Sequence, residues 1–587
     1  MASDNRVDDG TFLVGIAAGA VVSLGAASLA AGALAGLLSE GAPPRMTEPL
    51  PVTLLLSVAQ GPGSVYQPAP PAWLFYSAFG LLVVLLAVLA GVVVRHLGKR
   101  RRRSLAGGAT WGGAKVEKAM ALPDDPKERP DHLTAGRGQQ TGKVVGVIER
   151  SASAIAFGPP GSAKTSGLLA PNAAEWQGPA VVTTTKAADL EEIYAARSHV
   201  GPVWVIAPAG IPSGPWKTAH WSPIDYATDE EAAERMAEWM ADASQKNHDP
   251  KAEVWMTQAR AIVAGLLLGA RIATDGGIAA FRRWLALGEA AVDHVRAVLD
   301  SRYPEAALDY AQPWATLHDG GKGSVQLTLN VLAATYRSAG IRAASARTDF
   351  RAEELLERNG TLVLIAAPSQ AERFAPYFTS LIASVLHAAE TRYERVGRHP
   401  NRTLGLFVDE AGNFLRYPKL PNVLTTGRGM GIAVLSIWHD YSQLVARMGH
   451  EGARTIISAS TLRLLLPGLA DDETLRYMSF LFGKELVERT NRSSGDGRES
   501  TSTNVVETDL LPVHQLREIP KHTAIAMYFN QPPVRVNMRL TWRDPDVKAW
   551  LARPPAPDLP PPAASQYKPV ADPSALPFQM KEENSHG

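Results

Sequence analysis

The chain has 587 residues, of which 45% are hydrophobic and 20% are charged, a composition that suits several globular domains and excludes a largely disordered protein. The net charge of +1 excludes a general electrostatic attraction to nucleic acid, so binding of that kind would need a local patch. Because the chain has no cysteine, disulfides and cysteine-ligated zinc or iron–sulfur sites are also excluded.

Two long uncharged runs, residues 11–39 and 68–94, occupy the N-terminal part of the chain. A helix needs about 20 apolar residues to cross a bilayer, so we expect transmembrane helices at about 11–38 and 72–97. The basic run at 99–103 predicts that the part after it is cytoplasmic. Residues 1–104 would then form a multi-pass anchor in the cell (inner) membrane, with both termini in the cytoplasm and a short external loop. A cleaved signal peptide is disfavoured by the acidic flank of the first run.

The soluble part begins with residues 105–143, which are rich in Gly, Pro and charge and are interpreted as a linker and entry segment. From residue 144 short apolar runs alternate with helical patterns. This rhythm predicts an α/β fold with a RecA-like, doubly wound and mostly parallel sheet. The expected strands are residues 154–157, 180–184, 203–206, 361–366, 404–408, 432–437, 461–466 and 524–528.

Residues 225–350 show no strong strand pattern and are predicted to form an all-α insertion. The α/β domain around it would consist of residues 144–224 and 351–546. The Pro-rich residues 547–587 are predicted to be a disordered tail. The helices expected in the insertion are residues 230–243, 253–272, 276–287, 289–300 and 324–345.

The first chemical motif is the segment 158–165, GPPGSAKT, which follows the strand at 154–157 and opens a helix. Backbone N–H groups in such a P-loop bind phosphate, Lys164 would reach the β- and γ-phosphates of ATP, and Thr165 would bind Mg²⁺. A glycine usually precedes the lysine, but Ala163 stands here. Taken alone, the motif fits a turn that caps an ordinary helix equally well. The other predicted nucleotide-binding residues are Gly158, Gly161, Ser162 and Ala163.

The second motif is the apolar strand 404–408, which ends in Asp409 and Glu410. In P-loop enzymes such a strand lies beside the phosphate loop, Asp409 would hold Mg²⁺, and Glu410 would polarise the attacking water. One acidic strand end is common as a solvated turn. Both motifs in this order on one chain favour an ATP-hydrolysing enzyme.

A third motif, TTGRGMG at residues 425–431, places Arg428 in a glycine-rich turn. Such an arginine is a candidate finger that neutralises charge on a neighbouring subunit's nucleotide. On the residues alone, a solvated surface turn is the favoured interpretation.

These motifs resemble those of the type IV secretion coupling proteins of the TraG/TraD kind, the motor ATPases of bacterial conjugation. The resemblance extends from the N-terminal runs to about residue 546. One residue departs from the family pattern besides Ala163: family members usually place a Gln near the γ-phosphate where His439 falls. The segments that carry the resemblance are 165–172 (TSGLLAPN), 181–186 (VVTTTK), 221–225 (WSPID), 253–255 (EVW), 408–414 (VDEAGNF), 427–432 (GRGMGI), 442–444 (SQL) and 508–512 (TDLLP).

The resemblance implies a homo-hexamer at the membrane with ATP and Mg²⁺ sites shared between subunits, and it makes Arg428 a better candidate for the finger. It adds His439 to the candidate catalytic residues Glu410 and Arg428. It also implies an all-α domain that recognises relaxase-bound, single-stranded DNA or protein. The expected partners are therefore DNA, a relaxase or relaxosome, and the components of a type IV secretion channel.

Three alternatives stay open at this point. An FtsK-like pump of double-stranded DNA would normally carry a C-terminal winged-helix reader, for which the Pro-rich tail leaves no room. A non-hydrolysing nucleotide-binding receptor would fit Ala163 and His439. A two-span membrane protein with a purely structural soluble domain would require both nucleotide motifs to be coincidences.

Overall fold

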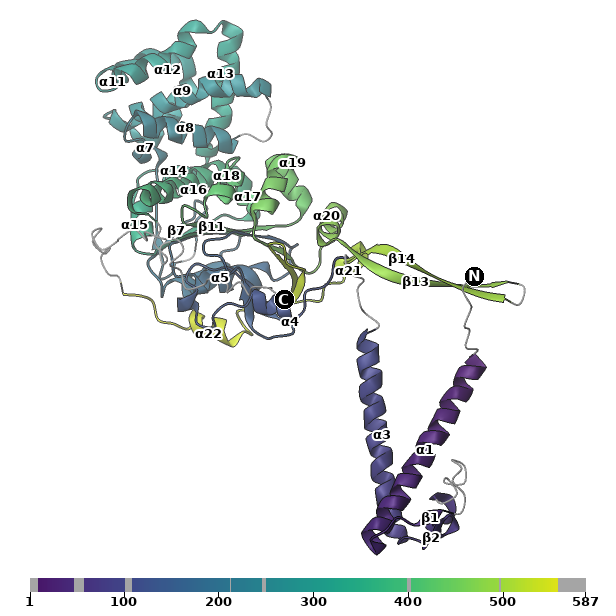
Figure 1. Cartoon of the computed structure of the whole chain (residues 1–587). Coiled ribbons are helices and arrows are strands. Elements are labelled where there is room, and N and C mark those ends of the chain that lie inside the picture. The colour runs from purple at the N-terminus through teal and green to yellow at the C-terminus, as the bar shows by residue number, and fades with distance from the viewer. Residues whose placement is uncertain are drawn as a thin grey trace. The chain divides into compact units, whose positions relative to one another are not determined.

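The computed structural model describes residues 9–46, 58–100, 108–211, 213–244, 250–397, 403–495 and 498–557. The chain divides into two compact units, Met1–Leu105 and Ala106–Gly587. The first unit contains the long helices α1 (Asp9–Glu40) and α3 (Ala72–Arg100), which pack against each other (Figure 1). Short strands β1 (Arg45–Met46) and β2 (Tyr66–Gln67) pair antiparallel in the connection between the helices.

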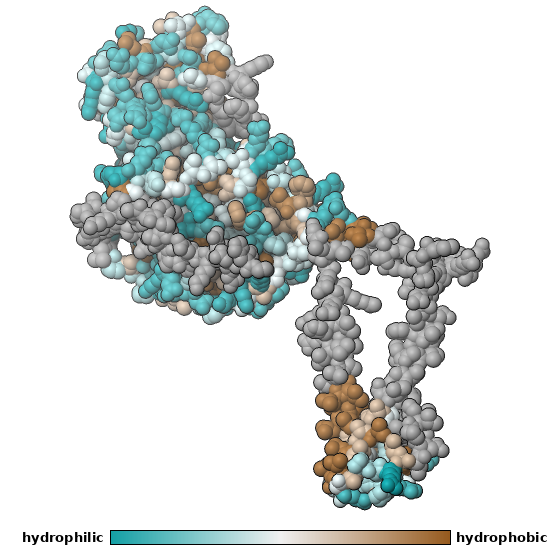
Figure 2. All heavy atoms as spheres, in the orientation of Figure 1, coloured by the Kyte–Doolittle hydropathy of each residue, from teal (hydrophilic) through white to brown (hydrophobic). Residues whose placement is uncertain are grey.

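The two helices cover the ranges in which membrane spans were expected. Figure 2 shows hydrophobic residues gathered along α3, where Trp73, Leu81 and Leu85 are exposed. Over the residues that the structure describes, no helix has both the length and the apolar character that crossing a membrane requires. Membrane anchoring therefore stays a prediction.

The second unit is built on a 12-stranded sheet with the order β4-β3-β16-β15-β12-β5-β11-β10-β6-β9-β7-β8. The eight strands from β12 to β8 run parallel, and the other four extend the sheet antiparallel. The predicted parallel α/β sheet is thus confirmed. The strands are β3 (Thr134–Gly138), β4 (Val144–Gly146), β5 (Ala154–Phe157), β6 (Ala180–Thr184), β7 (Val203–Ile206), β8 (Lys217–Thr218), β9 (Thr361–Ile365), β10 (Leu404–Val408), β11 (Ile432–Trp438), β12 (Leu462–Leu465), β15 (Thr523–Tyr528) and β16 (Val534–Asn537).

Both faces of the sheet are buried, as the apolar strands predict. Strand β5 shows the alternation: Ile155 and Phe157 belong to one core, and Ala154 and Ala156 belong to the other. Because side chains alternate along a strand, helices must cover both faces. The helices that flank the sheet are α4 (Ala114–Ala119), α5 (Ala170–Glu175), α6 (Asp189–Arg197), α16 (Pro368–Val396), α17 (Ala411–Phe414), α18 (Leu420–Thr426), α19 (Tyr441–Ala459), α20 (Asp472–Phe482), α21 (Val513–Arg517) and α22 (Pro545–Leu551).

The linker prediction for residues 105–143 is wrong in its central part. Helix α4 lies in this segment, and β3 pairs with β16 in the main sheet. The buried carboxylate of Glu117 accepts hydrogen bonds from the backbone amides of Gln140 and Thr141. Strand β3 contains two glycines and β16 follows two prolines, so neither has the composition from which a strand is predicted.

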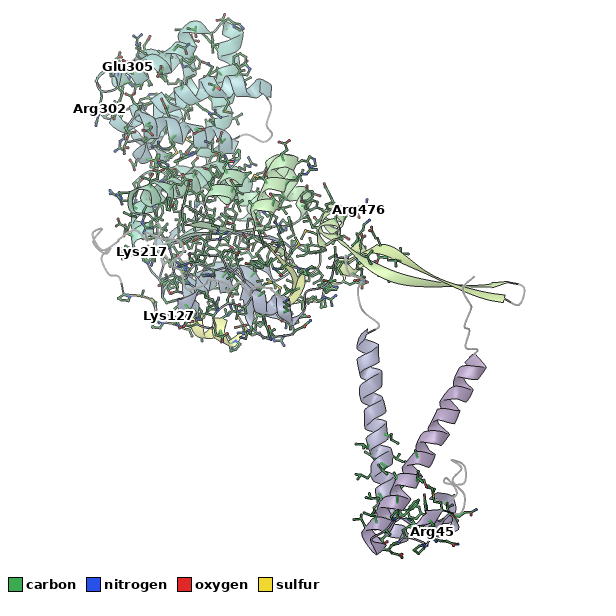
Figure 3. The ribbon with its side chains drawn as sticks, viewed as in Figure 1. Arg45, Lys127, Lys217, Arg302, Glu305 and Arg476 are labelled. Atoms are coloured by element: carbon green, nitrogen blue, oxygen red, sulfur yellow. The ribbon has the colours of Figure 1, made fainter. Side chains whose placement is uncertain are left out.

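The region 225–350 is helical, as predicted, but it is not a separate core. Its buried side chains form one continuous cluster with the face of the sheet, through α16. The single helix expected at 324–345 is interrupted at Thr335–Arg337, and α12 was not predicted. Figure 3 shows Arg302 and Glu305 at the outer end of this region. The helices in this region and at its two borders are α7 (Pro223–Tyr226), α8 (Glu230–Ser244), α9 (Pro250–Ile272), α10 (Gly277–Leu287), α11 (Val292–Asp300), α12 (Pro304–Thr316), α13 (Asp319–Ala333), α14 (Ala339–Ala344) and α15 (Ala352–Glu357).

Two further elements differ from expectation. A long antiparallel hairpin of β13 (Lys484–Gly495) and β14 (Arg498–Asp509) was not predicted, because its polar sequence lacks an apolar strand pattern. The predicted disordered tail is wrong for residues 547–551, which belong to α22, where buried Trp550 packs against Ala174 and Ala196. The prediction for residues 558–587 lies outside the described part of the chain.

Candidate functional site

Three adjacent parallel strands bring the predicted motifs to one edge of the sheet. The phosphate loop follows β5, His439 follows β11, and the pair Asp409–Glu410 follows β10. Strand β11 lies between β5 and β10 in the sheet. Carboxyl ends of parallel strands share an edge, so the intervening strand adds His439 to the site and does not separate the motifs.

The side chains of the two motifs touch. The hydroxyl of Thr165 donates a hydrogen bond of 2.6 Å to Oδ2 of Asp409. The ammonium nitrogen of Lys164 lies 3.5 Å from Oε1 of Glu410 and 3.5 Å from Nδ1 of His439. The structure therefore gathers a lysine, a hydroxyl, two carboxylates and an imidazole within one cluster.

The loop itself has the backbone of a tight phosphate cradle. Gly161 has φ 85°, and Ala163 has φ 62°, a left-handed conformation that is costly for any residue with a Cβ. At Gly158 a Cβ would lie 2.7 Å from Leu466 Cδ1, so the close approach there requires glycine. The hydroxyl of Ser162 is buried and has no hydrogen-bond partner among the described residues, as expected for a donor that awaits an anionic ligand.

Burial is the largest cause of the pKa shifts of two groups in the cluster, Asp409 and His439. Lys164 and Asp409 are only 6% and 3% exposed. Burial raises the pKa of Asp409, and the hydrogen bond from Thr165 and the charge of Lys164 oppose that rise. Burial, and then the Lys164 charge, lower the pKa of His439, which keeps its imidazole neutral at pH 7. A cation bound beside Asp409 would favour its ionised form.

Three positioning residues were not predicted. Thr183, on β6, donates from Oγ1 to the carbonyl oxygen of Asp409 at 3.0 Å. Asn413 donates to Oε2 of Glu410 at 3.0 Å, and the side-chain oxygen of Gln443 accepts from the amide of His439 at 3.1 Å. Asn413 and Gln443 lie in segments that carry the family resemblance, which is the signal that could have found them. Thr183 lies in another of these segments, 181–186, at the end of an apolar strand.

Arg428 is not brought to this cluster within the chain. It lies in the turn between α18 and β11, at the amino end of the strand whose carboxyl end leads to His439. A seven-residue strand such as β11 is about 20 Å long, so the arginine is at the opposite edge of the sheet. The side chain is exposed. Any action of Arg428 on a phosphate therefore requires a second copy of the chain.

The donor set fits a triphosphate with a divalent cation. A hydroxyl and a carboxylate already in contact, Thr165 and Asp409, are oxygen ligands of the kind that Mg²⁺ shares with phosphate oxygens and water. Across the described ranges, no group of three or more His, Cys, Asp or Glu side chains is placed to hold a metal ion. Ser162, whose hydroxyl has no partner among the described residues, and buried Lys164 both belong to the phosphate loop. A hydroxyl donor and an ammonium group suit the phosphates of such a ligand.

Comparison with known families agrees with this geometry. The family model described as "Type IV secretory system Conjugative DNA transfer" matches residues 117–557. The chain belongs to this family. The resemblance to type IV coupling proteins is therefore confirmed over residues 117–557, which include the helical insertion and α22, and it stays a prediction for the N-terminal runs.

Solved structures of one conjugative coupling protein, TrwB, share the fold of this family member. Unbound TrwB (TrwBdeltaN70) aligns with a TM-score of 0.58 and 17% identity over 74% of this chain and 93% of that chain. TrwB in complex with ADP and Mg²⁺ gives a TM-score of 0.56 and 18% identity, over 75% and 95%. TrwB in complex with the ATP analogue ADPNP gives a TM-score of 0.56 and 17% identity, over 75% of this chain and 95% of that chain. No curated protein matches the sequence.

Proposed function

We propose that this chain is a membrane-anchored coupling protein that hydrolyses ATP and delivers relaxase-bound DNA to a type IV secretion channel. The observation that carries the proposal is the contact between the phosphate-loop residues Lys164 and Thr165 and the acidic pair Asp409–Glu410. Family membership supports the role in conjugative DNA transfer. The TrwB complexes with ADP and Mg²⁺ and with an ATP analogue support the choice of nucleotide.

The proposed roles follow from the positions of the side chains. Mg–ATP supplies the phosphoryl group that is transferred to water. Lys164 neutralises the charge of the β- and γ-phosphates, and Thr165 with Asp409 holds the cation. Glu410, whose second oxygen is held by Asn413, orients the attacking water and accepts its proton.

His439 and Arg428 complete the proposed site from two sides. His439, neutral and 3.5 Å from Lys164, senses the γ-phosphate from the end of β11. Arg428 acts on the nucleotide of the adjacent subunit in a homo-hexamer, because its own phosphate loop lies at the far edge of the sheet. A head-to-tail interface gives a closed ring when the rotation between subunits divides the full turn, by 60° for a hexamer.

Anchoring in the cell membrane through α1 and α3 is part of the proposal. Its support is the pair of uncharged runs at 11–39 and 68–94 and the basic run at 99–103. The helical region 225–350 is proposed to receive the relaxase-bound substrate, and the channel components are the proposed acceptors.

The test is phosphate release by the full chain in detergent, with Mg–ATP, and with single- or double-stranded DNA added. We expect turnover that single-stranded DNA stimulates, and its loss in Lys164→Ala and Glu410→Gln. Lys127→Ala and Glu305→Gln are matched controls, since both side chains are exposed and Figure 3 shows them at opposite ends of the second unit.

Different outcomes separate the alternatives. Turnover that survives both site variants would remove the mechanism. Nucleotide binding without phosphate release under every DNA condition would support the non-hydrolysing receptor. Stimulation by double-stranded DNA alone would support the FtsK-like pump.

A further inference from the structure

The segment that follows β16 crosses the helix that begins at the phosphate loop. The backbone amide of Thr541 donates a hydrogen bond of 3.0 Å to the carbonyl oxygen of Ser166, the residue after Thr165. At the base of the same segment, the amide of Met538 donates to the carbonyl of His522, at 2.9 Å. The chain from residue 538 to 544 is thereby held against the first turn of this helix.

A local feature of the sequence explains this contact. The first turn, Thr165–Leu169, is a π-helix in which the amide of Ala170 bonds to the carbonyl of Thr165. The next bond of that ladder would join Pro171 to Ser166, but proline has no N–H. The Ser166 carbonyl is left for an outside donor, and Thr541 supplies it. A π-turn of this kind is frequent at functional sites.

Close packing holds the crossing segment in place. At Gly167 an added Cβ would lie 2.7 Å from Met538 Cε and 3.1 Å from Leu540 Cδ2. Met538 and Leu540 are themselves buried in the core under the sheet. The segment is therefore part of the rigid body, and the residue after Thr541 has a defined place beside the loop.

That residue is Trp542, a large aromatic side chain that is 57% exposed. Its ring meets the ring of His522 edge-on, with centroids 6.3 Å apart and planes at 85°. His522 is also exposed, and it adopts φ 65°, a left-handed conformation that is uncommon outside glycine. Trp542 thus follows the residue that bonds to Ser166, and its exposed ring lies against the ring of His522.

A nucleotide bound at the phosphate loop would place its base on the side of β5 where Trp542 and His522 lie. Loop amides hold the α- and β-phosphates, and Lys164 reaches the β- and γ-phosphates. The γ-phosphate would face Glu410 and His439, which follow β10 and β11, to one side of β5. The nucleoside therefore leaves toward the other side, where the sheet continues with β12, β15 and β16. His522 precedes β15 and Trp542 follows β16.

We propose that Trp542, with His522 at its edge, is the stacking surface for the base of the bound nucleoside triphosphate. This inference rests on the proposed function of the phosphate loop and adds the group that recognises the nucleoside. Stacking uses the face of a base, which every purine has, so the surface accepts ATP and GTP with little discrimination.

The test compares two probes, Mg–ATPγS and inorganic tripolyphosphate, by calorimetry on the full chain in detergent. In Trp542→Ala the Kd for Mg–ATPγS rises about 5- to 150-fold, the range that loss of one base–aromatic stack produces. Tripolyphosphate, which has no base, binds the variant as it binds the wild type. Trp542→Phe retains most of the nucleotide affinity.

Controls separate the possible failures. Phe529→Ala removes another exposed aromatic ring, at the opposite end of β15, and leaves both affinities unchanged. Unchanged nucleotide affinity in Trp542→Ala overturns the inference, and so does an equal loss for both probes, which would mean only that the tryptophan supports the loop. A wild-type chain that binds neither probe overturns the proposed function and this inference with it.

Discussion

Ala163 stands where the family pattern has glycine, and this departure strains the backbone of the phosphate loop. Its φ of 62° is left-handed, a conformation that costs an L-residue roughly 1–2 kcal/mol and glycine almost nothing. The loop keeps this shape because the lysine and threonine that follow must face the acidic pair. The sequence shows the alanine, and the structure shows that the strain accompanies it.

Replacing Ala163 by glycine should therefore stabilise the protein. Glycine removes the strain energy of the folded state, which outweighs the free-energy cost of a more flexible unfolded chain. The free energy of unfolding should therefore rise by about 0.5–1 kcal/mol. Chemical denaturation of the wild type and of Ala163→Gly measures this difference in the free energy of unfolding. The matched control is Ala170→Gly, at φ −62° in the same helix, which should lose stability. Equal losses in both variants would contradict the strain argument.

At the scale of elements, helix α5 is fastened to the C-terminal segment by a buried charge network. Glu175 accepts bonds of 2.7 Å and 2.6 Å from Arg539 and one of 2.7 Å from Arg129. All three side chains are at most 3% exposed. Burial alone raises the pKa of Glu175, but Arg539 and then Arg129 outweigh it, so the pKa lies below its usual value.

Glu175→Ala should destabilise the body by about 3–5 kcal/mol, because buried Arg129 loses its paired carboxylate and buried Arg539 keeps only Asp544, at 3.4 Å. Urea denaturation at pH 7 measures the loss, and Glu305→Ala, which removes an exposed carboxylate, is the control. A loss below 1 kcal/mol, roughly that of a surface pair, would contradict the argument.

The network also predicts the direction of a pH effect. A lowered pKa in the folded state means that the unfolded chain binds the proton first as the pH falls. The stabilisation by Glu175 is complete above its unfolded pKa of 4.5 and is lost as the pH falls through the lower folded value. Glu175→Gln should therefore show a smaller loss of stability between pH 5 and pH 3 than the wild type, in the same urea assay.

Element prediction succeeded where patterns are local. All eight strands expected from apolar runs lie in the main sheet, since a strand buried on both faces must be apolar throughout. The missed strands β3, β4, β8 and β16 are short or glycine-rich and depend on a neighbour already in place. In the site, Lys164 and Thr165 contact the acidic pair Asp409–Glu410, and β11 lies between the two strands that carry these motifs.

For the whole molecule, the position of Arg428 predicts that each nucleotide site is shared between two subunits, one with the phosphate loop and one with the arginine. Subunits with Lys164→Ala keep the arginine but lose their own nucleotide site, and subunits with Arg428→Ala do the reverse. Each variant alone should be inactive. Assemblies that contain both should regain partial ATPase activity, because some interfaces then pair an intact loop with an intact arginine.

The measurement is phosphate release by co-expressed, differently tagged subunits purified through both tags. Mixed assemblies that stay inactive would contradict a role in trans. Wild-type activity of Arg428→Ala alone would show that the arginine is a solvated turn residue, which was the alternative from the sequence.

The absence of cysteine makes membrane topology directly measurable. Ser64→Cys and Ser301→Cys each place a single thiol at an exposed position, in the first unit and in the helical region. If residues 40–67 form the external loop, an impermeant maleimide should label position 64 in intact cells and position 301 only after lysis. Labelling of both positions, or of neither, in intact cells would contradict the proposed anchor.

The sequence by itself determined the α/β class, the phosphate loop and the acidic strand end, because each is a local pattern with its own chemistry. Only the tertiary structure decided that β11 brings His439 between the two motifs and that Arg428 lies at the far edge. It also decided that Thr541 replaces the amide that Pro171 lacks. These facts depend on sheet order and on contacts between residues far apart in the chain, and no local pattern encodes them.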